Sequence, residues 1–261
     1  MAAVAKTFYY SDSRLYTASI TDGTISSTTF TPSDPPSSAV TNKNAINDEN
    51  ISLSVGAMEI NESLRIDLGS ALNPDFAAYY FKSSETADLQ LASSASATTS
   101  LANRVVLTTT FSAGWYLHES NLGATNVRYW FLRCYADPNL DNLSEFMMGT
   151  KLEFEVNPDI GGKEEEQHGT DNLISYSGVE YSKKRHNPKT ILTFNFSNIS
   201  QTFRNNLQTM ESVVGLEHKF LYSEDGTSGT FHYVKLADSM NFTEVAYQRY
   251  STTIKLREQL A

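Results

Sequence analysis

The sequence predicts a mainly β fold with one long α-helix. Apolar residues alternate with polar ones in several short runs, as at Leu64, Ile66 and Leu68, and clusters of turn residues separate these runs. A period of two is typical of strands that bury one face in an antiparallel sheet. The chain has 261 residues, of which 40% are hydrophobic and 19% charged, so it has enough apolar material for one large core or two small ones.

The charge balance argues against nucleic acid as a direct partner. The chain carries 20 basic and 30 acidic residues, a formal net charge of -10, which repels a phosphate backbone. We also expect no membrane insertion, because no stretch approaches the roughly 18 consecutive apolar residues that a spanning helix needs. The single Cys134 cannot form a disulfide within the chain, and the first residues lack the apolar core of a signal peptide. These features predict folding in a reducing cytoplasm.

The N-terminal part predicts a β-hairpin followed by a linker. Within 15–30, Asp22 and Gly23 lie between two runs of strand-forming residues, and an Asp-Gly pair supplies the positive φ that a two-residue hairpin loop needs. Segment 31–38 contains three prolines among small polar residues, which disfavours both helix and central strand. We therefore expect this linker to lead into a second domain.

In the middle of the chain, three further strands are predicted and two segments break the pattern. The alternation centres on 64–68, 127–132 and 152–156. Residues 92–100 are nearly all Ala, Ser and Thr, which predicts a surface loop. The Gly-rich and charged stretch 157–167 predicts an exit linker or a mobile loop.

The C-terminal part contains the predicted helix. Asn198 and Gln201 are placed to cap its start, Gly215 is placed to end it, and apolar residues recur at helical spacing between them. Alternating residues predict flanking strands at 192–196 and 250–256, the second of which ends in charges that would blunt an exposed edge.

These boundaries predict a discontinuous domain with an insertion. An N-terminal hairpin is too small to be stable alone, so we place it with the C-terminal part. The predicted organisation is one domain of residues 1–32 and 159–261, with residues 33–158 inserted as a second domain.

The sequence contains none of the common enzyme motifs. The patterns of nucleotide binding, zinc proteolysis and serine hydrolysis are absent, and the five histidines lack metal-ligand spacing. Cys134 follows Leu132 in an apolar strand, which favours a buried inert thiol, and the run Glu164–Glu166 lacks the pattern of a calcium loop. We predict no catalytic residue, no metal site and no cofactor. Hydrolysis of a surface polysaccharide is an alternative for which no spacing identifies a pair of carboxylates.

Two groups of residues are candidates for binding. Ring faces beside imidazole and amide donors are typical of sugar sites, which makes Trp115, Tyr116 and His118 a candidate glycan site, with a core role for Trp115 as the alternative. The second group consists of charged residues that could contact a neighbouring subunit, with a solvated turn as the alternative for the basic cluster; its members are Lys183, Lys184, Arg185, Arg257 and Glu258.

The middle region resembles the discoidin, or coagulation-factor type C, family. The likeness rests on segments that occur in the family's order, which are Ala45–Asp48, Ser63–Gly69, Val127–Arg133 and Leu143–Gly149. It implies a jelly-roll β-sandwich of the galactose-binding type, whose loops often bind glycans or lipid head groups. The chain departs from the family in lacking its terminal cysteine pair and in its Ala/Ser-rich segment.

The rest of the chain resembles the distal tail proteins of long-tailed bacteriophages. The likeness rests on Tyr176–Gly178, Lys183–Arg185, Thr193–Phe196, the helix with Gly215, Tyr233–Leu236 and Ile254–Glu258. It implies a β-rich, ring-forming hub domain with one helix that carries a sugar-binding-like sandwich as an addition.

Together the two resemblances imply a structural virion protein. We expect a homo-oligomeric ring, hexameric in that family, at the distal end of the tail tube, where it joins the tube protein to the tail hub, tip or receptor-binding proteins of the baseplate. The protein would be made in the host cytoplasm and reside in the virion. The alternative is a lectin-like module that binds a host-surface glycan.

Overall fold

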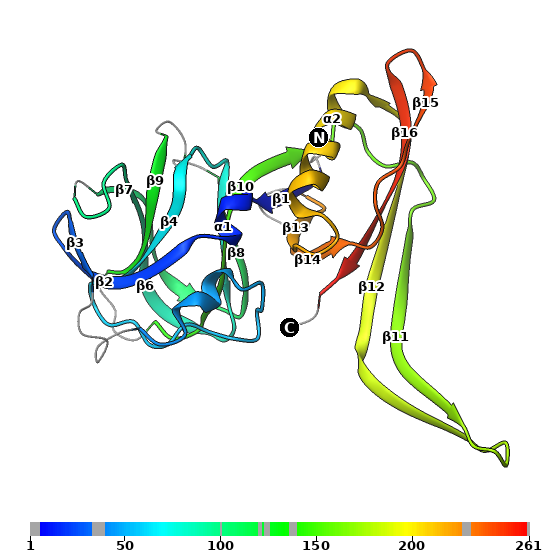
Figure 1. Ribbon diagram of the computed structural model, residues 1–261, viewed down its shortest axis with the longest axis horizontal. Helices are drawn as coiled ribbons and strands as arrows, with labels where there is room; N and C mark the ends of the chain where they lie inside the picture. The colour runs from blue at the N-terminus through cyan, green and yellow to red at the C-terminus, as the bar shows by residue number, and fades with distance from the viewer. Residues whose placement is uncertain are drawn as a thin grey trace. The chain divides into compact units, whose positions relative to one another are not determined.

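The structure is a computed structural model that describes residues 6–32, 40–99, 101–119, 122, 126–135, 140–225 and 231–259. The chain forms two compact units (Figure 1). Unit 1 comprises Met1–Phe8 and Leu152–Leu260, and unit 2 comprises Tyr9–Lys151. The prediction of a mainly β fold, with one long helix and a β-sandwich in the inserted unit, is confirmed.

Unit 2 is a sandwich of two antiparallel sheets. The first sheet has the strand order β3-β2-β4-β9-β6-β7. In the second sheet, the strands of this unit follow the order β1-β10-β5-β8. The first sheet is built from β2 (Ser19–Ser26), β3 (Thr29–Pro32), β4 (Glu62–Leu72), β6 (Glu85–Ser94), β7 (Ala102–Phe111) and β9 (Val127–Cys134). The second is built from β1 (Thr7–Ser11), β5 (Phe76–Phe81), β8 (Gly114–His118) and β10 (Leu143–Glu153). Helix α1 (Ser13–Tyr16) and the 3-10 helix η2 (Lys43–Asn47) lie between strands in the sequence.

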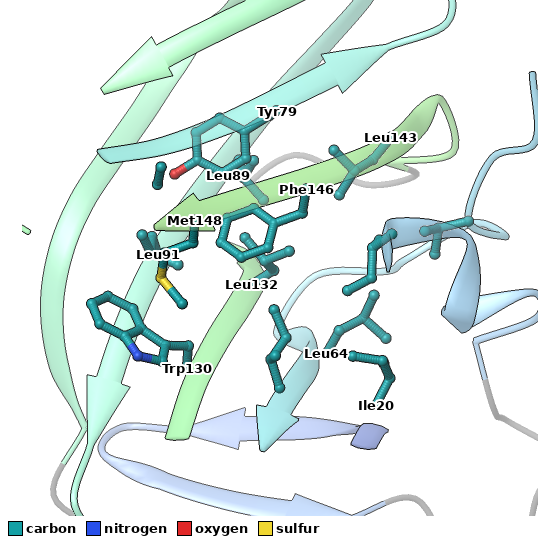
Figure 2. Close-up of a cluster of buried hydrophobic side chains, with 14 of the residues drawn as sticks. Ile20, Leu64, Tyr79, Leu89, Leu91, Trp130, Leu132, Leu143, Phe146 and Met148 are labelled. Carbon is teal, nitrogen blue, oxygen red and sulfur yellow. The ribbon is translucent and has the colours of Figure 1, made fainter. Parts of the chain in front are cut away.

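The core of unit 2 lies between these sheets. Figure 2 shows Tyr79, Phe146 and Met148 from one layer facing Leu132 and Trp130 from the other, and all five are buried. Burial of each large apolar side chain stabilises the fold by about 1.5–3 kcal/mol. The predicted strands at 64–68 and 127–132 are confirmed as β4 and β9. Cys134 is fully buried at the end of β9, which confirms its expected burial, and its inertness stays a prediction.

The predicted N-terminal hairpin exists, but its turn is not at Asp22 and Gly23. The turn lies at Ser27 and Thr28, where Ser27 adopts a φ of 57°. Asp22 and Gly23 lie inside β2 because they pair with β4. Only glycine fits at position 23, because a Cβ there would lie 2.7 Å from the ring of Phe30. The carboxylate of Asp22 accepts a hydrogen bond from Lys43 at 2.6 Å.

This pairing also changes the domain boundaries. Residues 9–32 belong to unit 2, not to the C-terminal part, because β2 forms a ladder with β4. Residues 31 and 32 of the predicted linker belong to β3, and residues 33–38 lie outside the described residues.

The predicted surface loop at 92–100 is wrong in its first part. Ala92, Ser93 and Ser94 are buried residues of β6 and pair with β9. Ala92 belongs to a small buried cluster with Phe30 and Phe131, and protein interiors of this kind are closely packed. The small residues of this segment therefore reflect close packing rather than a loop.

Unit 1 is a sheet covered on one face by helix α2 (Gln201–Val214). Its strand order is β11-β12-β16-β14-β13, with β15 pairing β16. The strands are β11 (Lys163–Ile174), β12 (Glu180–Ser200), β13 (Phe220–Ser223), β14 (Phe231–Leu236), β15 (Phe242–Ala246) and β16 (Arg249–Glu258). An aromatic cluster lies between helix and sheet, with Phe203 6.2 Å from Phe196 and 6.1 Å from Phe154, measured between ring centroids.

Three predictions for this unit are corrected. Residues 163–167 form the start of β11, since they pair with β12, and are not a linker. The strand predicted at 152–156 ends at Glu153. The terminal strand β16 is not an edge, because it pairs with both β12 and β14; Lys255 is exposed there, whereas Arg257 and Glu258 are half-buried.

The N-cap of helix α2 lies two residues after the predicted one. Ser200, not Asn198, is the N-cap residue, and its hydroxyl accepts a hydrogen bond from the Phe203 amide at 3.1 Å. The same hydroxyl donates to Glu155 at 2.5 Å, which ties the helix start to the preceding chain. Asn198 lies two residues before the cap, at a position of β12 that does not border the helix. Gly215 ends the helix as predicted.

We predict that Ser200→Ala lowers the free energy of unfolding of unit 1 by about 1 kcal/mol, the usual effect of losing an N-cap. Asn198→Ala is the matched control, since Asn198 is exposed, and should leave stability unchanged. Urea unfolding followed by far-UV circular dichroism measures both. An equal loss in the two variants would contradict this assignment of the cap.

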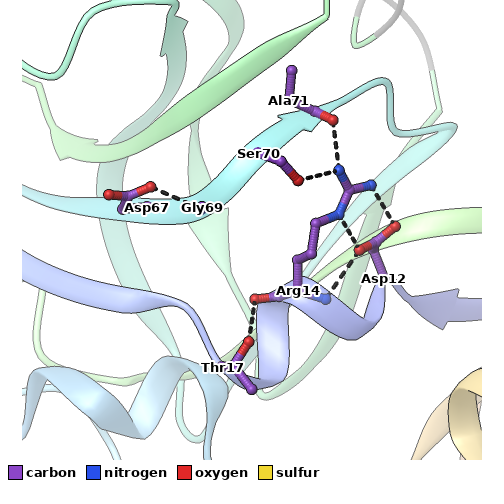
Figure 3. A network of polar contacts seen from close by, with 7 residues as sticks. All are labelled: Asp12, Arg14, Thr17, Asp67, Gly69, Ser70 and Ala71. Carbon is purple, nitrogen blue, oxygen red and sulfur yellow. Dashed lines mark hydrogen bonds and ion pairs between the residues drawn. The ribbon is translucent and has the colours of Figure 1, made fainter.

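A polar network joins the start of unit 2 to the end of β4 (Figure 3). The Arg14 guanidinium donates to both carboxylate oxygens of Asp12, at 2.6 and 2.8 Å, and to Ser70 Oγ and the Ala71 carbonyl. Asp12 also accepts from the Arg14 amide at 3.0 Å and so caps α1. These hydrogen bonds from Arg14 hold the pKa of Asp12 below its usual value of 3.8.

Arg14→Ala should lower the stability of unit 2 by about 1–2 kcal/mol at neutral pH, because it removes charge-assisted hydrogen bonds. Asp12 has a lowered pKa in the folded state, so its stabilising effect is present above pH 3.8 and is lost as pH falls through that lowered pKa. The difference between variant and wild type should therefore shrink in acid to the part contributed by the hydrogen bonds to Ser70 and Ala71, which do not titrate. Tryptophan fluorescence reports on this unit, since both tryptophans, Trp115 and Trp130, belong to it. A difference that persists unchanged in acid would exclude this ion pair as its cause.

Candidate functional site

The described part of the chain holds no group of three or more His, Cys, Asp or Glu side chains that could bind a metal ion. Within the same residues, no helix is both long and apolar enough to cross a membrane. Three surfaces of the described residues carry candidate binding groups.

The first surface is β8, which carries the predicted glycan residues on two opposite faces. Side chains alternate along a strand, so Tyr116 and His118 point one way and Trp115 the other. The Tyr116 ring packs edge-on against Phe111 at 4.9 Å, and its hydroxyl bonds to the backbone of Ser112. His118 lies beside buried Tyr79, and burial lowers the pKa of its imidazole, which is thus neutral at pH 7. The three residues do not converge on one ligand.

Trp115 is half-buried and has an aromatic neighbour that the sequence did not reveal. Its ring centroid lies 5.3 Å from that of Tyr80, which is opposite it on β5 and is also half-buried. The pair lies on the face of the second sheet that points away from the sandwich core. Only the register between β5 and β8 brings these rings together, and no local pattern encodes that register. Asn121, an amide that follows these residues in the sequence, lies outside the described residues.

The second surface is a two-stranded ribbon in unit 1. Strand β16 pairs with β12 only from Ile191 onward, so residues 168–187, here called the arm, pair with each other alone. Figure 1 shows β11 and β12 running on together beyond β16. Lys183, Lys184 and Arg185 lie on the arm and are exposed, and Arg185 forms an ion pair with Asp171.

The end of the arm is apolar and exposed. Leu173 and Tyr181 face each other across the two strands, with 70% and 61% of their surface exposed. The arm tip, defined as these two residues with Ile174, Tyr176 and Val179, holds five large apolar side chains in solvent. The sequence did not predict the arm tip, because the neighbouring basic residues gave the stronger pattern. The signal that could have identified the arm tip is the group of apolar residues close to a turn.

The third surface is the face of the unit 1 sheet opposite α2. By alternation, Arg257 points to this face, whereas Leu256 points to the helix. Glu258 points to the other side, where its carboxylate lies 3.3 Å from His232 Nδ1. The predicted subunit contacts Arg257 and Glu258 therefore lie on opposite faces of an interior strand, away from the basic residues of the arm. An open groove of about 440 Å³ lies beside Arg257 and Lys235.

No family model matches the chain, and no curated protein matches its sequence. Among solved structures, it is similar to a chitosan-binding module of a chitosanase/glucanase from Paenibacillus sp. IK-5, with a TM-score of 0.39 and 14% identity over 54% of this chain and 98% of that one. It is also similar to CBM32-1 of a family 31 glycoside hydrolase from Clostridium perfringens, with a TM-score of 0.36 and 15% identity over 50% of this chain and 94% of that one. Both of these structures are carbohydrate-binding modules. The resemblance to tail proteins stays a prediction.

Proposed function

We propose that this chain is a structural, non-enzymatic subunit that assembles with copies of itself into a ring. In line with the sequence resemblance, the ring would be hexameric and would join the tail tube of a bacteriophage to its hub or adhesion proteins. The observation that carries the proposal is the arm tip, an exposed apolar surface on a ribbon that has no core of its own.

An isolated two-stranded ribbon is marginally stable in water. The arm tip adds an unfavourable exposure of large apolar groups, each of which would stabilise a complex by about 1.5–3 kcal/mol if it were buried. Contiguous exposed apolar groups are typical of protein interaction sites. A second copy that covers the arm tip would remove this exposure and stiffen the ribbon.

Strand β11 offers a second means of contact between copies. It is the terminal strand of its sheet, and in the described residues its outer edge pairs with no strand. Unpaired strand edges are templates for pairing with another chain, and cyclic symmetry lets such contacts close without leaving free edges. Both features favour a closed ring over a monomer.

Leu173→Ser combined with Tyr181→Ser should convert the assembled protein largely to monomers, because it removes the apolar pair across the arm. The matched control is Val245→Ser with Tyr247→Ser, which changes exposed apolar residues of unit 1 outside the arm, with 53% and 86% of their surface exposed. Light scattering of purified protein gives the mass of each. A monomeric wild type, or an arm variant with the wild-type mass, would refute the proposal.

The exposed aromatic pair of unit 2 favours a second candidate function, binding of a host-surface glycan. Trp115 and Tyr80 are half-buried and lie next to each other on an outer sheet face. Aromatic faces with accessible surface bind the apolar faces of sugar rings. This function is compatible with a ring, since the pair belongs to the inserted unit.

If the glycan candidate is correct, Trp115→Ala abolishes the signal of the purified protein on a glycan array and its adsorption to host cells. Tyr116→Phe serves as control because the Tyr116 ring faces the core and should leave binding at the wild-type level. An array without signal for wild type, or equal binding by the Trp115 variant, would remove this candidate.

A further inference from the structure

Four cations gather on the sheet face of unit 1 that points away from α2. They are Lys189 on β12, Lys219 before β13, Lys235 on β14 and Arg257 on β16, here called the basic face. Lys235 and Arg257 are direct partners in the antiparallel ladder, so like charges stand opposite each other. Like charges opposite each other destabilise a sheet. The stability of the isolated fold therefore does not account for this pair.

Within the described residues, three cations of the basic face lack a carboxylate partner. Two neighbouring lysines on the same side of the sheet are paired, Lys255 with Asp238 at 3.1 Å and Lys163 with Glu165 at 3.9 Å. In the described part of the chain, by contrast, Lys189, Lys235 and Arg257 have no carboxylate within ion-pair distance, and the buried Arg257 Nε has no hydrogen-bond partner. This is notable in a chain with a net charge of -10.

The cations are close enough to affect one another. Burial is the main cause that lowers the pKa of Lys189, and repulsion from Arg257, Lys235 and Lys219 lowers it further. The groove of about 440 Å³ beside them is lined by Lys235 and Arg257 and has an apolar side formed by residues such as Leu216. The groove thus combines an excess of positive over negative side chains with apolar surface, since its lining holds Lys235, Lys255 and Arg257 against Glu165 and Asp238.

We propose that the basic face is a docking site for an acidic segment of a partner protein, whose carboxylates complete the charge pairs that this chain leaves open. Carboxylates would accept hydrogen bonds from Arg257 and the lysines, and the aliphatic part of the segment would cover the apolar side of the groove. The inference does not depend on ring formation, because the arm and the basic face are separate surfaces.

The observations favour an acidic peptide over a nucleic acid. Proteins that bind single strands stack bases on exposed aromatic rings, and none of the described residues that line this groove is aromatic. The positive charge is also confined to one short patch, with Glu165 and Asp238 in the groove lining, whereas a nucleic acid backbone needs a continuous basic track.

The test is fluorescence anisotropy of a dye-labelled oligo-glutamate peptide titrated with the full chain. We expect saturable binding that weakens with added NaCl. The variant Lys189→Gln, Lys235→Gln, Arg257→Gln should bind on the order of tenfold more weakly or worse. The matched control Lys183→Gln, Lys184→Gln, Arg185→Gln removes the same charge from the arm and should bind like wild type. Circular dichroism verifies folding of each variant.

Three results would overturn the proposal. They are the absence of peptide binding to wild type, an equal loss in the arm control, and tighter binding of a single-stranded oligothymidylate of equal charge. A second measurement does not depend on the probe. Lys235→Gln alone should raise the melting temperature at low salt, because it removes the repulsion across the ladder, and a lower melting temperature would show that Lys235 already has a stabilising partner.

Discussion

A ribbon of two strands has no interior, and this constraint governs unit 1. Strand β12 spans 21 residues but is paired by the 10-residue β16 over only part of its length. Beyond the end of β16, neither a third strand nor helix α2 covers the side chains of β11 and β12. The apolar residues near the turn are exposed because β11 and β12 extend beyond β16, not because the sheet is badly packed. Their burial requires a surface from outside the ribbon.

Unit 2 buries its apolar side chains without a partner. Its two sheets cover each other, so the alternating residues of β4, β5, β9 and β10 meet in a dry core. Binding surfaces in such a sandwich are limited to its outer faces and loops. This is why Trp115 and Tyr116, adjacent in sequence, have different roles, since one faces outward beside Tyr80 and the other packs on the core.

The net charge of the whole chain does not reveal the positive charge of the basic face. The net charge of -10 argues against polyanions as partners, yet four cations share one sheet face. They come from four places in the sequence that are far apart, and the strand order β12-β16-β14-β13 brings them together. Among the described residues, no carboxylate lies within ion-pair distance of Lys189, Lys235 or Arg257.

The sequence by itself determined the elements whose signal is local. Alternation predicted β4, β9, β12 and β16, and helical spacing with Gly215 predicted α2, because each pattern reflects which face of a single element is buried. It could not locate the hairpin turn, since Asp22 and Gly23 have the composition of a turn but are held in a strand by β4 and by the ring of Phe30. It also assigned Ala92–Ser94 to a loop, because small residues in a loop and small residues beneath aromatic rings look alike in one dimension. Strand order and register decided the rest: which unit contains residues 9–32, that β16 is an interior strand, and which side chains share a face. These depend on pairing between distant segments, and the energy of that pairing arises only when both partners are folded.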